Sequence, residues 1–154
     1  MPRIQLVPAP SYPFVTEIQI YISHVNQGGH LDNAQLLTLV SEARVRFFKS
    51  LGYVESAVEG VLTVVADIVA QYQSEGFHGE TMRVEMLPVD FNKYGFDLQF
   101  RMSDKASGRG VALGKVGIVF ITREHRKVAL VPAAFRELVS HLVDSPPLST
   151  HNLK

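Results

Sequence analysis

Polar and apolar residues alternate from Phe14 to Ser23, which predicts a strand with one apolar face. A helical pattern follows from Asn33 to Leu51, where apolar side chains recur every three or four positions: Leu36, Leu37, Val40, Ala43, Phe47 and Leu51. Leu39 and Phe48 widen this apolar surface, so packing on one side alone would leave one of them in water. The pattern therefore predicts a central helix that is wrapped by a sheet or buried at a subunit contact.

Local signals mark both ends of this helix. Asp32 is the expected N-cap, and Gln35 stands three residues later as its capping-box partner. Gly52 follows as a C-terminal stop. The helix is thus expected to begin directly after a polar loop.

Four further strands are expected after Gly60, because long runs rich in Val, Ile, Phe and Tyr are separated by turn residues. They are Val61 to Tyr72, Thr81 to Val89, Gly95 to Met102 and Val111 to Thr122. The gaps are too short for crossover helices, so the strands should be antiparallel. Pro132 is expected at the first position of a short closing helix. The fold class is α+β, with an antiparallel sheet of five to six strands around one long central helix.

The chain of 154 residues, 46% of them hydrophobic, fits one globular domain. Prolines at 2, 8, 10 and 13 predict an extended N-terminal arm over residues 1–13. We expect a single domain over residues 14–143 and a flexible tail over residues 144–154, which contains Pro146 and Pro147.

The charge and the cysteine content of the chain restrict the kinds of binding partner and of chemistry that we expect. Lys plus Arg and Asp plus Glu number 15 each, so no net charge favours nucleic acid or an anionic membrane as a partner. The chain has no cysteine, which removes disulfides and thiolate nucleophiles and is compatible with a reducing compartment. Its first apolar stretch is too short and too rich in proline for a signal peptide or a membrane span. We expect a soluble cytoplasmic protein.

The densest chemistry lies in residues 23–36, between the first strand and the helix. This segment combines glycines, histidines, amides and a carboxylate, and it ends on helix amides that favour a developing negative charge. Loops held by rigid elements often carry catalytic groups. It is therefore the candidate active site.

The run from His24 to Asn33 resembles the Asp-x-Asp-x-x-Gly-His-Val-Asn-Asn loop of hotdog-fold acyl-CoA thioesterases, specifically the 4-hydroxybenzoyl-CoA thioesterase-like group. Gly29, His30 and Asn33 match directly. Two later segments also resemble this family, Ser41-Glu42-Ala43-Arg44 on the helix and Val128-Ala129-Leu130-Val131-Pro132 after the last strand. The resemblance spans about residues 14–132. It implies a hotdog fold and a homodimer or homotetramer without a cofactor. It also implies hydrolysis of an acyl-CoA or related acyl thioester, with the pantetheine arm along the subunit interface.

One departure bears on the mechanism. Asn26 stands where many members of the family carry the carboxylate that acts as nucleophile or general base. An amide cannot deprotonate water or attack as a carboxylate does. The same comparison puts His24 at the first Asp position and Asp32 where Asn is more usual.

The expected roles follow from residue chemistry and from the resemblance. His30 is the candidate base, since an unperturbed imidazole titrates at about pH 6.5 in water. Asn26 would orient water or substrate. Gly29 and the backbone amide of Asn33 would bind the substrate, with the amide as oxyanion donor. Asp32 is either the helix cap or a carboxylate base that assists the attack of water.

For two further carboxylates, Glu42 and Asp67, a structural role is the alternative to a catalytic one. Glu42 either assists from the helix across a dimer or pairs with Arg46 on the surface. Asp67 interrupts an apolar strand, where it lies on the open face or pairs at an interface.

Several alternatives stay open. His24, His30 and Asp32 form a candidate set of metal ligands. Enoyl-CoA hydration or dehydration on the same fold is one rival function, and a non-catalytic acyl-thioester binding module is another. Coenzyme A phosphates would need cations, for which the candidates are Lys93, Arg101, Lys105, Arg109, Arg123, Arg126 and Lys127.

Overall fold

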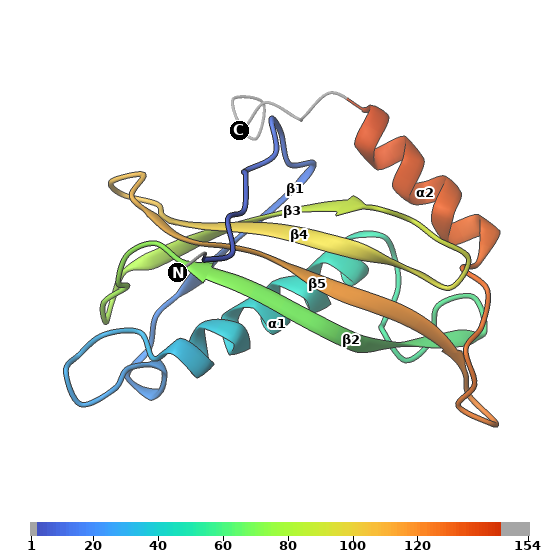
Figure 1. Ribbon diagram of the computed structural model, residues 1–154, viewed down its shortest axis with the longest axis horizontal. Helices are drawn as coiled ribbons and strands as arrows, with labels where there is room; N and C mark the ends of the chain where they lie inside the picture. Colours follow the sequence, from blue (N-terminus) through green and yellow to red (C-terminus); the bar gives the residue numbers. More distant parts are fainter. Residues whose placement is uncertain (1–2, 146–154) are drawn as a thin grey trace.

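The computed structural model describes residues 3–145 and contains one five-stranded antiparallel sheet with two α-helices (Figure 1). The strands are β1 (Phe14–Gln19), β2 (Val61–Tyr72), β3 (Thr81–Val89), β4 (Gly95–Asp104) and β5 (Gly110–Thr122). They lie in the order β1-β3-β4-β5-β2, so β1 and β2 form the two edges of an open sheet. Every neighbouring pair is antiparallel, as the short connections predicted.

Helix α1 (Asn33–Ser50) lies across one face of this sheet (Figure 1). It begins at the predicted residue and ends one residue before the predicted Leu51. Leu39 and Phe48 are 1% and 0% exposed, so contacts within the same chain cover both residues, including the Phe135 ring that stacks on Phe48. This confirms the central helix that the apolar pattern predicted.

Helix α2 (Ala133–Asp144) closes one end of the core through Phe135, which is fully buried. The Phe135 ring centroid lies 5.8 Å from that of Phe48 and 5.4 Å from that of Phe120. Pro132 is the N-cap of α2 and not its first helical residue, so the expected position was wrong by one. Its ψ of 131° is extended, and helical backbone begins only at Ala133.

The first strand ends at Gln19, before the predicted Ser23. Ile20 still pairs through its backbone with Gly79 and Glu80, but β3 begins only at Thr81 and no neighbouring strand continues beyond this point in the described chain. The backbone instead forms a short 3-10 helix, η1 (Ile22–His24), in which Ile22 is 74% exposed. Alternation alone therefore overestimated the length of this strand.

Residues 3–13 form neither helix nor strand and reach across the sheet. The Leu6 amide donates to Gln71 Oε1 at 2.9 Å, and the Arg101 guanidinium lies 4.7 Å from the centroid of the Tyr12 ring. The predicted arm and tail include residues 1–2 and 146–154, which lie outside the described residues. Within residues 3–145, neither helix is long and apolar enough to cross a membrane.

Candidate active site

The loop between β1 and α1 lies at one end of the sheet, beside the β2–β3 connection and near the turn between β4 and β5 (Figure 1). The Leu31 amide donates to the Gly76 carbonyl at 2.8 Å, and His30 and Phe77 form an isolated antiparallel bridge. The Asp32 amide donates to the His24 carbonyl at 2.9 Å. Backbone pairing thus fixes the loop against a segment that lies more than forty residues away in the chain.

Asn26 closes the loop with both its backbone and its side chain. Its Oδ1 accepts hydrogen bonds from the amides of Gly28 and His30 at 3.0 and 3.2 Å. The Gly29 amide donates to the Asn26 carbonyl, and Gly29 has a φ of 79°, a left-handed conformation that favours glycine. The side-chain oxygen of Asn26 is therefore engaged by the loop, and only its Nδ2 is left to orient a water or a substrate.

His30 presents two different nitrogens. Nδ1 is buried and lies 2.9 Å from Glu75 Oε2, a contact that is close but too bent for a regular hydrogen bond. Nε2 is open to solvent and has no hydrogen-bond partner within residues 3–145. The ring centroid lies 5.2 Å from that of Phe77, and a Cβ added at Gly28 would lie 2.9 Å from His30 Cδ2. The imidazole is thus confined on three sides, with Nε2 as its accessible edge.

Glu75 was not among the residues selected from the sequence. The segment Ser74-Glu75-Gly76 lies between two of the predicted strands, and no local motif connects it with His30. The contact arises because the Leu31 amide pairs with the Gly76 carbonyl across the fold.

One backbone amide at the start of α1 is available to bind a substrate oxygen. The Asp32 side chain accepts hydrogen bonds from the amides of Ala34 and Gln35 at 3.0 and 3.2 Å, as expected of an N-cap. The Asn33 amide has no acceptor within residues 3–145, and Asn33 is exposed. The Tyr72 hydroxyl donates to the Asn33 carbonyl at 2.9 Å, so the helix start lies beside edge strand β2. A free amide at a helix N-terminus can polarise a carbonyl oxygen.

Glu42 is not brought to this loop within the chain. It lies nine residues beyond Asn33, about 14 Å along the helix at 1.5 Å per residue. Its Oε1 accepts from Arg46 Nε at 3.1 Å, and Arg46 also donates to Thr16 Oγ1. The structure therefore places Glu42 in the surface ion pair that is its simpler role.

The alternative of a metal site has no matching geometry in the described residues. His24 Nδ1 accepts from the Tyr21 amide at 3.0 Å, and the carboxylate of Asp32 caps the helix. In the part of the chain that the structure describes, no three His, Asp or Glu side chains are grouped to hold a metal ion. His24, His30 and Asp32 are therefore not assembled as a ligand set.

Comparison with known families decides the classification. The family model described as the thioesterase-like superfamily matches residues 21–139, more than half of the chain. The chain belongs to the thioesterase-like superfamily. Among curated proteins, none matches the sequence. The predicted family is confirmed, and thioester hydrolysis is the activity that this membership supports.

Solved structures of the same fold agree with this membership. A 1,4-dihydroxy-2-naphthoyl-CoA thioesterase from Synechocystis is similar with a TM-score of 0.78 and 18% identity, over 86% of this chain and 98% of its own. A thioesterase from Thermus thermophilus, solved with coenzyme A and Zn, has a TM-score of 0.76 and 22% identity, over 90% of this chain and 100% of its own. These likenesses confirm the hotdog fold.

The Lys and Arg residues expected to bind phosphates do not all lie at the end of the sheet that carries the loop. The turn after β5 carries Arg123, Arg126 and Lys127, and Figure 1 shows it at the opposite end from the loop. Lys93 lies in the β3–β4 connection, where its carbonyl accepts from the Val131 amide. Arg109 lies at the loop end, and its guanidinium donates to the Glu75 carbonyl at 3.0 Å. Arg109 is therefore the candidate cation with a direct contact near His30.

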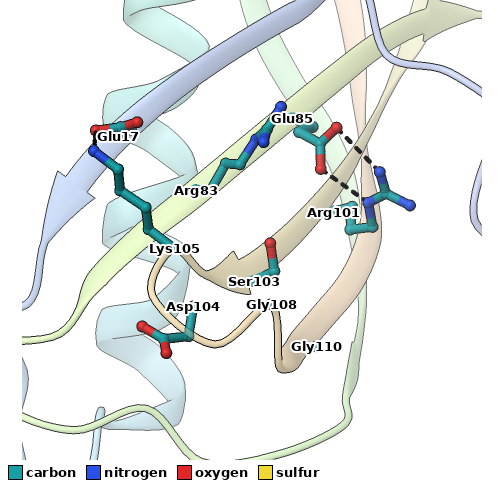
Figure 2. A pocket seen from close by; sticks show the side chains of 9 residues that line it. All are labelled: Glu17, Arg83, Glu85, Arg101, Ser103, Asp104, Lys105, Gly108 and Gly110. Carbon is teal, nitrogen blue, oxygen red and sulfur yellow. Dashed lines mark hydrogen bonds and ion pairs between the residues drawn. The ribbon is translucent and has the colours of Figure 1, made fainter.

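A charged hollow of about 460 Å³ lies on the sheet face opposite α1 (Figure 2). Arg101 donates twice to Glu85, both at 3.0 Å, and Lys105 pairs with Glu17 at 2.8 Å. Its lining holds three cations and three carboxylates, so it has no net charge to attract a phosphate. Arg101 and Lys105 are thus engaged in ion pairs on this face of the sheet. Asp67 is engaged similarly, because its carboxylate accepts from Lys115 Nζ at 2.7 Å.

Proposed function

We propose that the chain hydrolyses an acyl-CoA thioester at the loop of residues 23–36. The observation that carries this proposal is the free Asn33 amide at the start of α1, on the same loop as the His30 imidazole, whose Nε2 faces solvent. An amide donor and a base on one loop are the minimum that thioester hydrolysis requires. The naphthoyl-CoA thioesterase of Synechocystis and the coenzyme A complex from Thermus thermophilus support a CoA thioester as the substrate class.

The reaction balances with these groups. His30 Nε2 takes a proton from water as the water oxygen bonds to the thioester carbon. The carbonyl oxygen becomes negative and is stabilised by the Asn33 amide and by the helix dipole. When the C–S bond breaks, the imidazolium returns the proton to the leaving thiolate. The products are a carboxylic acid and the free thiol of coenzyme A.

We further propose that two copies of the chain pair along β2 to complete the site. β2 is a twelve-residue edge strand, and its Val65, Ile68 and Tyr72 side chains are 38%, 40% and 50% exposed. A long apolar edge without a partner favours strand pairing. Because Tyr72 donates to the Asn33 carbonyl, a partner on β2 would also cover the helix start. Light scattering after gel filtration tests this, with a doubly charged edge (Val65→Glu and Ile68→Glu) expected to be monomeric. Val143→Glu on α2 is the control and should leave the assembly unchanged.

The deciding experiment measures free thiol released from aromatic, short-chain and long-chain acyl-CoAs. His30→Ala should lose about a hundredfold in kcat, within the range of general base catalysis, while retaining its fold. Asn26→Ala should lose activity through disorder of the loop. His125→Ala, at a side chain 74% exposed near the opposite end, should behave as wild type. Wild-type turnover by His30→Ala would remove this residue as the base.

One observation favours a second candidate function, a non-catalytic module that binds acyl thioesters. Asn26 supplies an amide where related loops supply a carboxylate, and its oxygen is already bonded to two amides. Binding of acyl-CoA measured by calorimetry, without thiol release across the whole panel, would establish this function and exclude the hydrolase.

A further inference from the structure

The carboxylate of Glu75 lies beside the buried nitrogen of His30, although the two residues are 45 positions apart. We propose that Glu75 is a positioning residue for His30, holding the proton on Nδ1 so that Nε2 is the basic atom facing the substrate. This inference rests on the proposed function and adds a residue from a segment that the loop motif does not include.

The first support is the asymmetry of the imidazole. Glu75 Oε2 lies 2.9 Å from Nδ1, and Nδ1 is buried without another partner in the described chain. A neutral imidazole carries its proton on one nitrogen, and the neighbour of that nitrogen determines which one. A carboxylate beside Nδ1 accepts that proton's hydrogen bond, which leaves the lone pair on Nε2.

The second support is that the Glu75 backbone is fixed. The Arg109 guanidinium donates to the Glu75 carbonyl at 3.0 Å and to Ser74 Oγ at 3.2 Å. It also donates to both carboxylate oxygens of Glu80, at 2.8 and 3.0 Å. Glu80 in turn accepts from the Phe77 amide at 2.7 Å, and the Phe77 ring packs on His30. The segment that carries Glu75 is therefore held by Arg109, in the turn between β4 and β5, and by the packing of Phe77 on the His30 imidazole.

The third support is the missing charge at position 26. The Asn26 amide closes the loop but brings no negative charge, so it cannot stabilise the imidazolium that forms when water is deprotonated. Asp32 has a charge, but its Oδ2 accepts from the Ala34 and Gln35 amides. Among residues 3–145, Glu75 is the carboxylate in ion-pair contact with His30.

The experiment combines nuclear magnetic resonance and kinetics on the full chain. Long-range ¹⁵N–¹H correlation reports which imidazole nitrogen carries the proton, and His30→Gln assigns the His30 signals. The wild type should show the proton on Nδ1. Glu75→Ala should give mixed tautomers and a kcat about tenfold lower with KM within about twofold, the low end for general base catalysis because the Glu75 side chain is 64% exposed. Glu75→Gln retains an acceptor at the same length and should recover the wild-type tautomer and part of the rate.

Glu124→Gln is the matched control, since it removes the same charge from a side chain that is 86% exposed. Its tautomer and kcat should equal those of the wild type. An unchanged tautomer or an unchanged kcat in Glu75→Ala overturns the positioning role. If the wild type releases no thiol, the proposed function fails with the kinetic role, whereas the tautomer measurement still decides whether Glu75 orients His30.

Discussion

Replacing Asn26 by aspartate changes one group of the loop, the side-chain Nδ2, into an oxygen. Oδ1 would keep its hydrogen bonds from the Gly28 and His30 amides, at 3.0 and 3.2 Å. Nδ2 makes no hydrogen bond within residues 3–145, so the new oxygen enters the site without losing a partner. The substitution therefore tests the missing carboxylate with little disturbance of the fold.

Its effect on stability can be worked from the two bonds. A hydrogen bond to a neutral acceptor contributes about 1 kcal/mol to stability, and one to a charged acceptor contributes about 2 kcal/mol. Each of the two bonds would therefore gain about 1 kcal/mol when the acceptor becomes charged, about 2 kcal/mol together. Asn26 is exposed, and Glu75 places a like charge beyond His30. Solvent screening and this repulsion reduce the gain to about 1 kcal/mol or less. We expect Asn26→Asp to be as stable as the wild type at pH 7, or slightly more stable.

Its effect on rate should be larger. A carboxylate at this position can act as a general base, a contribution of about 100- to 10,000-fold when no other base is present. Since His30 already provides a base, we expect a gain of about tenfold in kcat for thiol release. Asn92→Asp is the matched control, because Asn92 Oδ1 also accepts from two amides, those of Tyr94 and Gly95, away from the loop. A variant at position 26 that is less stable by more than about 1 kcal/mol, or no faster than Asn92→Asp, would refute the reasoning.

Three further predictions each concern a single contact. Gly28→Ala places a methyl group 2.9 Å from His30 Cδ2, so kcat should fall about tenfold through displacement of the ring, with the melting temperature nearly unchanged; an unchanged kcat would contradict this. Phe135→Ala should lower the free energy of unfolding in urea by about 3 to 4 kcal/mol, because the ring is fully buried; a loss below about 1 kcal/mol would mean that α2 is not needed for the core. The hydrogen bond to Glu59 raises the pKa of Tyr53 from 10.0 to about 12. The stability that this hydrogen bond gives the folded protein is therefore complete below pH 10 and is lost as the pH rises through about 12. Ultraviolet titration of the wild type should show that the Tyr53 phenol ionises at this raised pKa, and Glu59→Gln should lower the pKa of Tyr53 toward 10.0.

Those parts of the fold that depend on neighbouring residues were predictable. Asp32 and Gly52 bound α1 because capping and termination are local, and the helix bounds differ from the prediction by one residue. The first strand was overestimated because Ile20 and Ile22 continue the alternation, whereas the neighbouring antiparallel strand β3 begins only at Thr81 and offers no partner beyond it. Strand ends depend on where a partner ends, and the sequence of one strand does not contain that information.

The candidate site was predictable only along the loop itself. His30, Asp32 and Asn33 stand in one short segment, so their approximate proximity followed from the sequence. Glu75 did not follow, because it reaches His30 through the pairing of Leu31 with Gly76, a long-range contact without a local pattern. The roles of the loop residues stay predictions until turnover is measured.

The loop separates two tasks that one carboxylate at position 26 could perform together. Asn26 performs the structural task, since its oxygen holds the amides of Gly28 and His30. The charge comes instead from Glu75, whose backbone is held by Arg109. Pairing with Glu80 raises the pKa of Arg109, so this anchor stays charged wherever the protein is folded. The electrostatics at His30 therefore depend on the turn between β4 and β5, which joins the site through Arg109 without touching the imidazole.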